Sequence, residues 1–126
     1  MSNKKPKIKE MKRNEFKTQN PIGPEDLPKL KYLLLCLRND QKSAEFRYPV
    51  NYEALGLLDY PLIIKKPMDI STVSSNLKNG KYQYIEGCLN DIQLIWDNCM
   101  HFNAEGSWIY NLAEDLEIQS QKMISN

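Results

Sequence analysis

Residues 84–103 have the sequence YIEGCLNDIQLIWDNCMHFN, and this stretch decides the fold. Its apolar side chains recur at steps of three and four residues, which places them on one face of an α-helix. They are Ile85, Leu89, Ile92, Ile95, Trp96, Cys99 and Phe102. Asp91 and Asp97 fall off this stripe, and no proline interrupts it. The stretch is therefore predicted to be a core helix of about five turns, ending at Asn103 before the turn-like segment 104–107.

Three further stretches carry apolar residues at helical spacing. The first runs from Leu27 to Asn39, the second from Ile70 to Leu77, and the last from Trp108 to about Met123. Asp69 is placed to cap the second stretch, and Asn79-Gly80 to end it with a left-handed residue. Four amphipathic helices with no competing strand pattern predict an all-α fold, a four-helix bundle.

The connection between the first two helices, residues 40–59, has no sustained period but many apolar and aromatic residues. Connections this long are uncommon in compact domains and are often functional. A short helical turn is expected at residues 59–64, before the break at Lys65-Lys66-Pro67. We therefore expect this connection to pack its apolar side chains against the bundle.

Charge divides the chain into two parts. Residues 1–20 carry seven Lys or Arg against two Glu and almost no apolar residues, so we expect a flexible basic tail that the fold does not need. Residues 21–126 form the predicted domain; with ten basic and fourteen acidic residues their net charge is −4. An acidic domain suits a basic partner, and we expect no direct nucleic-acid binding by it. No apolar run approaches the ~20 residues that span a bilayer, so no membrane association is expected.

Motifs for catalysis or metal binding are missing from the sequence. His101 is the only histidine, and Cys36, Cys88 and Cys99 form no CxxC pair, so we expect no metal and no cofactor. The chain has no glycine-rich phosphate loop, GxSxG or HExxH motif, and no nucleophile placed beside a base. We therefore expect a protein that is not an enzyme, with its cysteines acting as small apolar side chains.

The loop and the helix ends supply the parts of an apolar cavity with one amide and one phenol. Asn103 would provide the amide and Tyr60 the phenol. The apolar candidates are Phe46, Val50, Leu55, Leu57 and Ile109. Such a cavity suits a small neutral ligand with a polar tip. On pattern alone, the favoured interpretation is that these residues simply fill the core.

A series of motifs resembles the signature of the bromodomain family. DYPLII at residues 59–64 and PMDISTV at residues 67–73 are followed in the family's order by Leu77, Tyr82, Asp91, Asn98-Cys99 and Asn103. The resemblance covers about residues 27–120. It implies a left-handed bundle of four helices, named Z, A, B and C in the family. It also implies binding of acetylated lysine, mostly on histone tails.

The resemblance assigns roles by position. Asn103 resembles the asparagine that donates to the acetyl carbonyl, and Tyr60 the tyrosine that reaches the same oxygen through a water. Phe46, Pro49, Val50, Leu55 and Leu57 match loop positions that line the slot, Ile109 matches the gatekeeper, and Phe102 replaces the tyrosine that usually precedes the asparagine. The family's Trp-Pro-Phe shelf is Ala44-Glu45-Phe46 here, so its tryptophan wall is missing. Trp108, beside the gatekeeper position, is a candidate to fill that wall.

We therefore expect a monomeric acetyl-lysine reader in the nucleus, with a role in chromatin regulation and acetylated histone tails as partners. Acetylation makes this assignment physically reasonable, because it replaces a charged ammonium by a neutral amide that a dry slot accepts at far lower cost. The alternative is a bromodomain-like scaffold for protein interactions with weak or lost acetyl-lysine binding, which Ala44 and Phe102 favour and which Tyr60 and Asn103 argue against.

Overall fold

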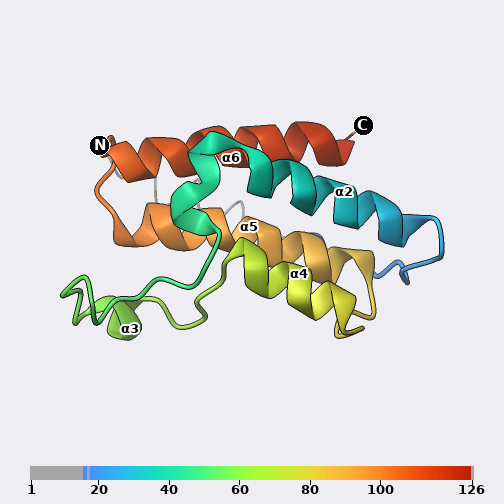
Figure 1. Cartoon of the computed structure of the whole chain (residues 1–126), viewed down its shortest axis with the longest axis horizontal. Coiled ribbons are helices and arrows are strands. Elements are labelled where there is room, and N and C mark those ends of the chain that lie inside the picture. Colours follow the sequence, from blue (N-terminus) through green and yellow to red (C-terminus); the bar gives the residue numbers. More distant parts are fainter. Residues whose placement is uncertain (1–15, 17, 126) are drawn as a thin grey trace.

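The computed structural model describes residues 16 and 18–125. Four long helices form a bundle (Figure 1): α2 (Asp26–Asn39), α4 (Ile70–Lys78), α5 (Ile85–Phe102) and α6 (Trp108–Ser125). The all-α prediction is confirmed, since the only β-type pairing among the described residues is an isolated bridge between Pro21 and Tyr84. No helix in this part of the chain has the length and apolar content needed to cross a bilayer.

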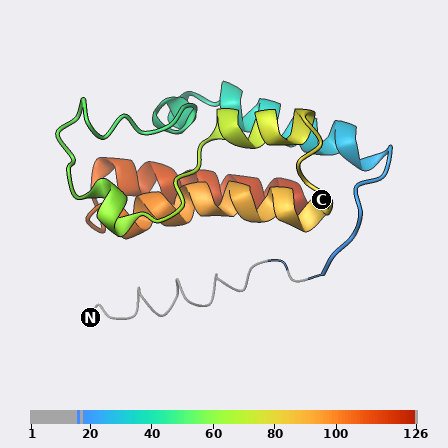
Figure 2. The ribbon, with the colours of Figure 1, turned by 90° about the horizontal axis from the view of Figure 1, so that it is seen from below.

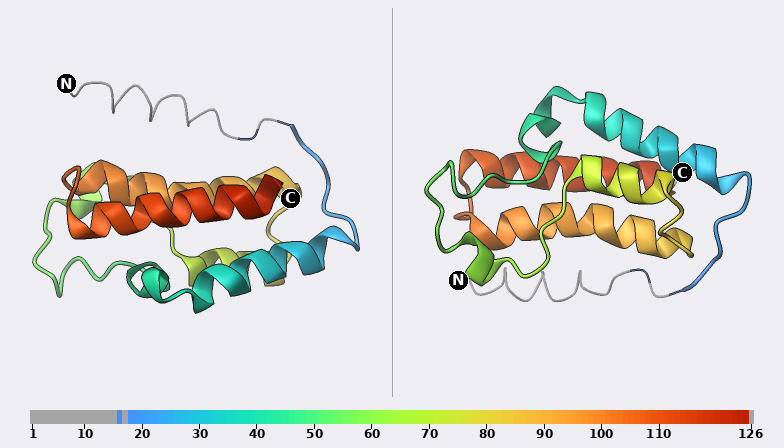
Figure 3. Two further views of the ribbon diagram at one scale, coloured as in Figure 1. Left: turned by 90° about the horizontal axis from the view of Figure 1, so that it is seen from above. Right: turned by 60° about the horizontal axis from the view of Figure 1, so that its bottom comes forward.

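The helices lie in two layers. The view from below in Figure 2 and the view from above in Figure 3 both place α2 beside α4 and α5 beside α6. The core between the layers includes Leu37, Val73 and Leu116, each with no exposed surface. Trp96 is also fully buried, and its Nε1 donates to the Ser120 hydroxyl over 3.2 Å. The indole N–H therefore has a partner inside the core, as a buried tryptophan requires.

Helix α4 begins and ends as its sequence predicts. The Asp69 carboxylate accepts hydrogen bonds from the Thr72 backbone N–H at 3.0 Å, from the Thr72 hydroxyl at 2.6 Å and from the Ser71 hydroxyl. It thereby satisfies donors that the first turn leaves without intrahelical partners. Gly80 follows with a φ of 69°, a left-handed conformation that glycine adopts without a steric penalty.

The long connection, which spans residues 40–69 between α2 and α4, contains a helix that the periodicity did not predict. A 3-10 helix, η1 (Gln41–Phe46), opens it, and a single turn, α3 (Tyr60–Ile63), lies near its end. The Asp40 side chain caps η1 by accepting from the Lys42 N–H at 2.8 Å, and the Arg47 guanidinium donates to the Ser43 hydroxyl and the Asp40 carbonyl. These contacts fold the start of the connection, which lies at the end of the bundle where α5 ends and α6 begins (Figure 1).

The last residues of the predicted tail contact α5. Asn20 donates to the Glu86 carboxylate through its backbone N–H and its Nδ2, both at 2.7 Å, and the Thr18 hydroxyl donates to it at 2.9 Å. The Asn20 carbonyl accepts in return from the Ile85 N–H at 2.8 Å. A domain boundary after residue 20 would therefore leave Thr18 and Asn20 outside the domain, although both donate hydrogen bonds to Glu86 within it. Residues 1–15 and 17, which the tail prediction also covers, lie outside the described part.

Glu86 is buried at the start of α5, where these donors stabilise its charged form. Burial alone would raise its pKa, but the hydrogen bonds from Asn20 and Thr18 outweigh burial and hold the pKa below its ordinary value of 4.5. A carboxyl with a lowered folded-state pKa stabilises the fold above its ordinary pKa, and this contribution is lost as the pH falls through the folded-state pKa.

We therefore expect a variant lacking residues 1–20 to unfold at a lower temperature than the full chain near pH 7. The loss of these charged hydrogen bonds should cost about 1–2 kcal/mol, or about 3–8 °C in a domain of this size. The difference should shrink as the pH falls from 4.5 through the lowered folded-state pKa of Glu86, where its carboxylate becomes protonated. Circular dichroism melts at both pH values measure it. The control lacks residues 1–15 only and keeps Thr18 and Asn20; equal melting temperatures for all three chains would contradict the prediction.

Candidate functional site

A cavity of about 150 Å³ lies where the long connection meets the end of α5 and the start of α6. Its lining residues are Glu45, Phe46, Tyr48, Val50, Leu55, Leu57, Tyr60, Met68, Ile95, Asn98, Cys99, Phe102, Asn103 and Ile109. An apolar cavity of about this volume holds a group the size of benzene. The cavity therefore has room for the tip of a side chain.

Most of the site residues named from the sequence meet at this cavity. Those that line it are Phe46, Val50, Leu55, Leu57, Tyr60, Phe102, Asn103 and Ile109. Pro49 does not: it is exposed, and its neighbours Tyr48 and Val50 form that part of the wall. Eight of the nine residues thus lie together at one cavity, while Pro49 is exposed to solvent instead.

Six lining residues were not named as site residues. They are Glu45, Tyr48, Met68, Ile95, Asn98 and Cys99. The sequence offers a reason to place Ile95 and Cys99 at the site, because both belong to the apolar stripe of α5. It offers one for Met68 and Asn98 as well, since they lie within the motifs that carry the family resemblance. It offers none for Tyr48, because an irregular loop has no period from which the orientation of a side chain follows.

Asn103 joins α5 to the cavity. As the C-cap of α5, it donates from its backbone N–H to the Cys99 carbonyl at 3.0 Å, and its Nδ2 donates to the same oxygen at 3.0 Å. These two bonds fix the side chain at the end of the helix. The same Nδ2 also lies 3.5 Å from the Cys99 Sγ, a weak acceptor that the carbonyl oxygen of a ligand can replace.

Tyr60 is held between two aromatic rings. Its ring stacks on Tyr52 with centroids 5.9 Å apart and meets Phe102 edge to face at 4.8 Å. Burial, with a smaller contribution from Cys99, raises the pKa of the phenol above its ordinary value of 10.0. Tyr60 therefore keeps its proton at neutral pH and can donate a hydrogen bond. Phe102 supports the tyrosine ring although it lacks a hydroxyl of its own.

The side of the cavity nearest Ala44, where the family's tryptophan is missing, differs from the prediction. Ala44 is exposed in η1 and does not line the cavity, whereas Glu45 and Tyr48 do. Trp108 does not line it either, and 67 % of its surface is exposed. The proposal that Trp108 fills this wall is wrong, because the first turn of α6 directs the next residue, Ile109, at the cavity instead.

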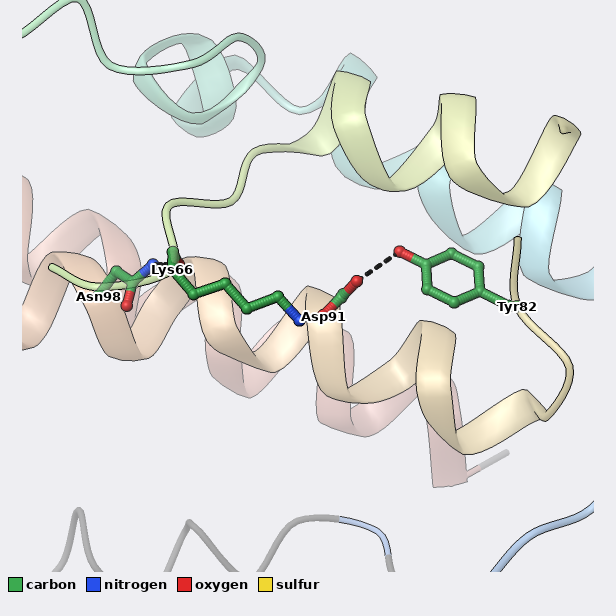
Figure 4. A network of polar contacts seen from close by, with 4 residues as sticks. All are labelled: Lys66, Tyr82, Asp91 and Asn98. Carbon is green, nitrogen blue, oxygen red and sulfur yellow. Dashed lines mark hydrogen bonds and ion pairs between the residues drawn. The ribbon is translucent and has the colours of Figure 1, made fainter. Parts of the chain in front are cut away.

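A polar network behind the cavity ties the long connection to α5 (Figure 4). The Asn98 Nδ2 donates to the Lys66 carbonyl at 2.8 Å, and the Lys66 Nζ lies 3.3 Å from the Asp91 carboxylate. Tyr82, from the segment between α4 and α5, donates its hydroxyl to Asp91 at 2.6 Å. Asp91 is off the apolar stripe yet only 8 % exposed, and these partners explain how its charge is tolerated there.

A comparison with protein-family models matches the bromodomain model over residues 30–115. This chain is a bromodomain. Its all-helical fold agrees with the second bromodomain of Candida albicans Bdf1 in the unbound form, with a TM-score of 0.77 and 28 % identity over 82 % of this chain and 98 % of that one. The same Candida domain bound to an imidazopyridine gives a TM-score of 0.76 and 29 % identity over 80 % of this chain and 98 % of that one.

Relatives of known sequence carry names from transcription and chromatin biology. Bromodomain-containing factor 2 of Saccharomyces cerevisiae is 33 % identical over 91 % of this chain and 17 % of its own length. Histone acetyltransferase GCN5 of Debaryomyces hansenii is 41 % identical over 68 % of this chain and 18 % of its own length. Transcription factor GTE7 of Arabidopsis thaliana is 35 % identical over 88 % of this chain and 21 % of its own length. The chain thus spans about a fifth of the length of these relatives.

Proposed function

We propose that this bromodomain is a non-enzymatic reader that binds acetylated lysine, chiefly in histone tails, and acts as a monomer in chromatin regulation in the nucleus. The observation that carries the proposal is the meeting of Asn103 and Tyr60 at one apolar cavity. The names of the relatives support the nuclear setting.

The cavity suits the chemistry of an acetylated lysine. In our proposal the acetyl carbonyl accepts a hydrogen bond from the Asn103 Nδ2 and a second one, through a water, from the Tyr60 hydroxyl. The methyl group packs against Phe46 and Val50. An unmodified lysine would bring an ammonium into the same apolar space, where its desolvation would cost far more than that of a neutral amide. Rejection of the charged form therefore contributes to selectivity as much as attraction does.

Features around the cavity favour a basic, extended partner. Glu45 lines the cavity and is exposed, so its carboxylate can attract cations next to the acetylated residue. Leu55 and Leu58 of the connection are 65 % and 76 % exposed and offer apolar contact to flanking side chains. A single shallow site of this kind should bind with a dissociation constant of about 1 µM or weaker, and a second mark or domain would strengthen it.

The proposal is tested by binding to an array of acetylated histone peptides with unmodified peptides alongside. We expect binding to a subset of acetylated peptides and none to their unmodified forms, and titration calorimetry then gives the dissociation constants. A folded protein that binds no acetylated peptide would favour the alternative, a bromodomain scaffold that has lost its ligand.

A tryptophan at position 44 should strengthen binding. Ala44 precedes Glu45 of the cavity wall and is exposed, so the larger ring can be added without filling the core. We expect Ala44→Trp to tighten binding of a flat acetyl-lysine mimic by about 0.5–1.5 kcal/mol, because an aromatic ring can stack on it. Calorimetry on both proteins measures the change, with Ala54→Trp, at an exposed loop position outside the lining, as the control. Equal affinities in all three proteins would show that Glu45 and Tyr48 already close the wall.

A further inference from the structure

A second groove lies between α2 and α4 and shares no lining residue with the cavity of Asn103. Figures 2 and 3 show the two helices side by side in one layer. The groove has a volume of about 290 Å³. Leu34 and Leu77 form its apolar floor, and Leu35, which is 48 % exposed, extends that apolar surface to solvent. We name this feature the α2–α4 groove.

Three cations border the floor of the groove. Lys31 and Arg38 belong to α2, and Lys78 belongs to the last turn of α4. All three are exposed, and no ion pair joins them to a carboxylate within the described part of the chain. Their charges are therefore available to a partner.

The sign of this charge is opposite to that of the domain. Residues 21–126 carry ten basic and fourteen acidic side chains, a net charge of −4. Helix α2 nevertheless has three cations against the single carboxylate of Asp26, and α4 has Lys78 and no carboxylate. A cationic surface on an otherwise acidic domain steers and orients an acidic partner.

The arrangement of apolar and charged residues identifies the kind of partner. Lys31, Leu35 and Arg38 stand at positions i, i+4 and i+7 of α2 and so span about 10 Å along one face. This length matches two turns of a helix whose apolar stripe would cover the leucines while its flanking carboxylates meet the cations. A phosphate backbone would use the cations but would gain nothing from the leucines. Residues 1–20, with a net charge of +5, have the wrong sign to occupy the groove.

We propose that the α2–α4 groove docks an acidic amphipathic helix of a partner protein, separately from the cavity of Asn103. The probe is a fluorescein-labelled peptide of about 14 residues with leucines at i, i+3, i+4 and i+7 and glutamates at the flanking positions. Its comparison peptide has the same composition in scrambled order. Fluorescence anisotropy measures both, and we expect the patterned peptide to bind at least about fivefold more tightly, because only it can place apolar and acidic groups together.

Two variants of the protein separate the contributions. Arg38→Glu combined with Lys78→Glu should weaken binding of the patterned peptide by at least about tenfold, because two attractive contacts become repulsive. Leu35→Ser should weaken it by about threefold or more through lost apolar burial. Lys122→Glu, at an exposed position of α6, is the matched control and should leave the affinity unchanged. Circular dichroism checks that each protein is folded.

The proposal is overturned if the scrambled peptide binds as well as the patterned one, or if Lys122→Glu weakens binding as much as the groove variants. A duplex DNA probe supplies the remaining test. The groove would be a nucleic-acid surface if DNA bound more tightly than the peptide, lost affinity in the double variant and ignored Leu35→Ser. Binding of acetylated histone peptides should be the same in all these variants, so failure at the groove is distinguishable from failure at the cavity.

Discussion

A folded Asn103→Ala variant should lose detectable binding to acetylated histone peptides. Removal of the amide leaves the acetyl carbonyl in an apolar cavity without its direct donor, which costs about 1–3 kcal/mol. This is about 5–150-fold in the dissociation constant, starting from an affinity that is already weak. Titration calorimetry against one acetylated peptide makes the comparison with the wild-type protein.

The fold should tolerate this substitution. The Asn103 side chain donates to the Cys99 carbonyl, but the backbone N–H of residue 103 donates to the same oxygen and remains in the variant. Asn79→Ala is a matched control, because Asn79 is also a helix C-cap and its amide also bonds four residues back, to Ser75. It lies outside the cavity lining and should leave peptide binding unchanged.

Tyr60→Phe should weaken binding by less than Asn103→Ala. The phenol is proposed to act through a water, which can be retained or replaced at small cost, and the aromatic contacts with Tyr52 and Phe102 survive the loss of the hydroxyl. An Asn103→Ala protein that is folded by circular dichroism and binds as tightly as wild type would show that this cavity is not the acetyl-lysine site.

The fold and the location of the cavity follow from local patterns in the sequence. The stripe of α5, the Asp69 cap and the Gly80 stop all act within a few residues, so spacing alone predicts them. The position of Asn103 is visible in the sequence for the same reason, because a helix end beside an apolar loop is a local pattern. The motif series then supplied a family whose model matches most of the same residues.

The features that the sequence did not predict depend on contacts between distant residues. The spacing of α5 puts Asp91 off its apolar stripe and gives no sign that Asp91 is buried. Its burial depends on the donor Tyr82 and the cation Lys66, which come from other segments. The polar end of the tail looked dispensable because it has little apolar surface to bury, yet Asn20 and Thr18 satisfy the buried Glu86. In both cases a buried carboxylate selects its partners through space, and periodicity carries no information about them.

Asp91→Ala should lower the stability of the domain by about 2–3 kcal/mol, since hydrogen bonds to charged groups are stronger than neutral ones and the Tyr82 hydroxyl would lose its acceptor. This corresponds to about 6–15 °C in the melting temperature. Most of the loss should come from Tyr82, because Lys66 is 67 % exposed and an ion pair with so exposed a cation is worth at most about 1 kcal/mol.

A double-mutant cycle tests this division. Tyr82→Phe and Lys66→Met are each combined with Asp91→Ala, and urea unfolding gives the coupling energies. We expect the Tyr82–Asp91 coupling to be the larger by about 1 kcal/mol or more. Asp115→Ala, at an exposed position of α6, controls for removal of a carboxylate and should change stability by less than about 0.5 kcal/mol. If the Lys66–Asp91 coupling proved the larger, the long connection would be held by its ion pair, and its anchoring should then weaken as salt is added.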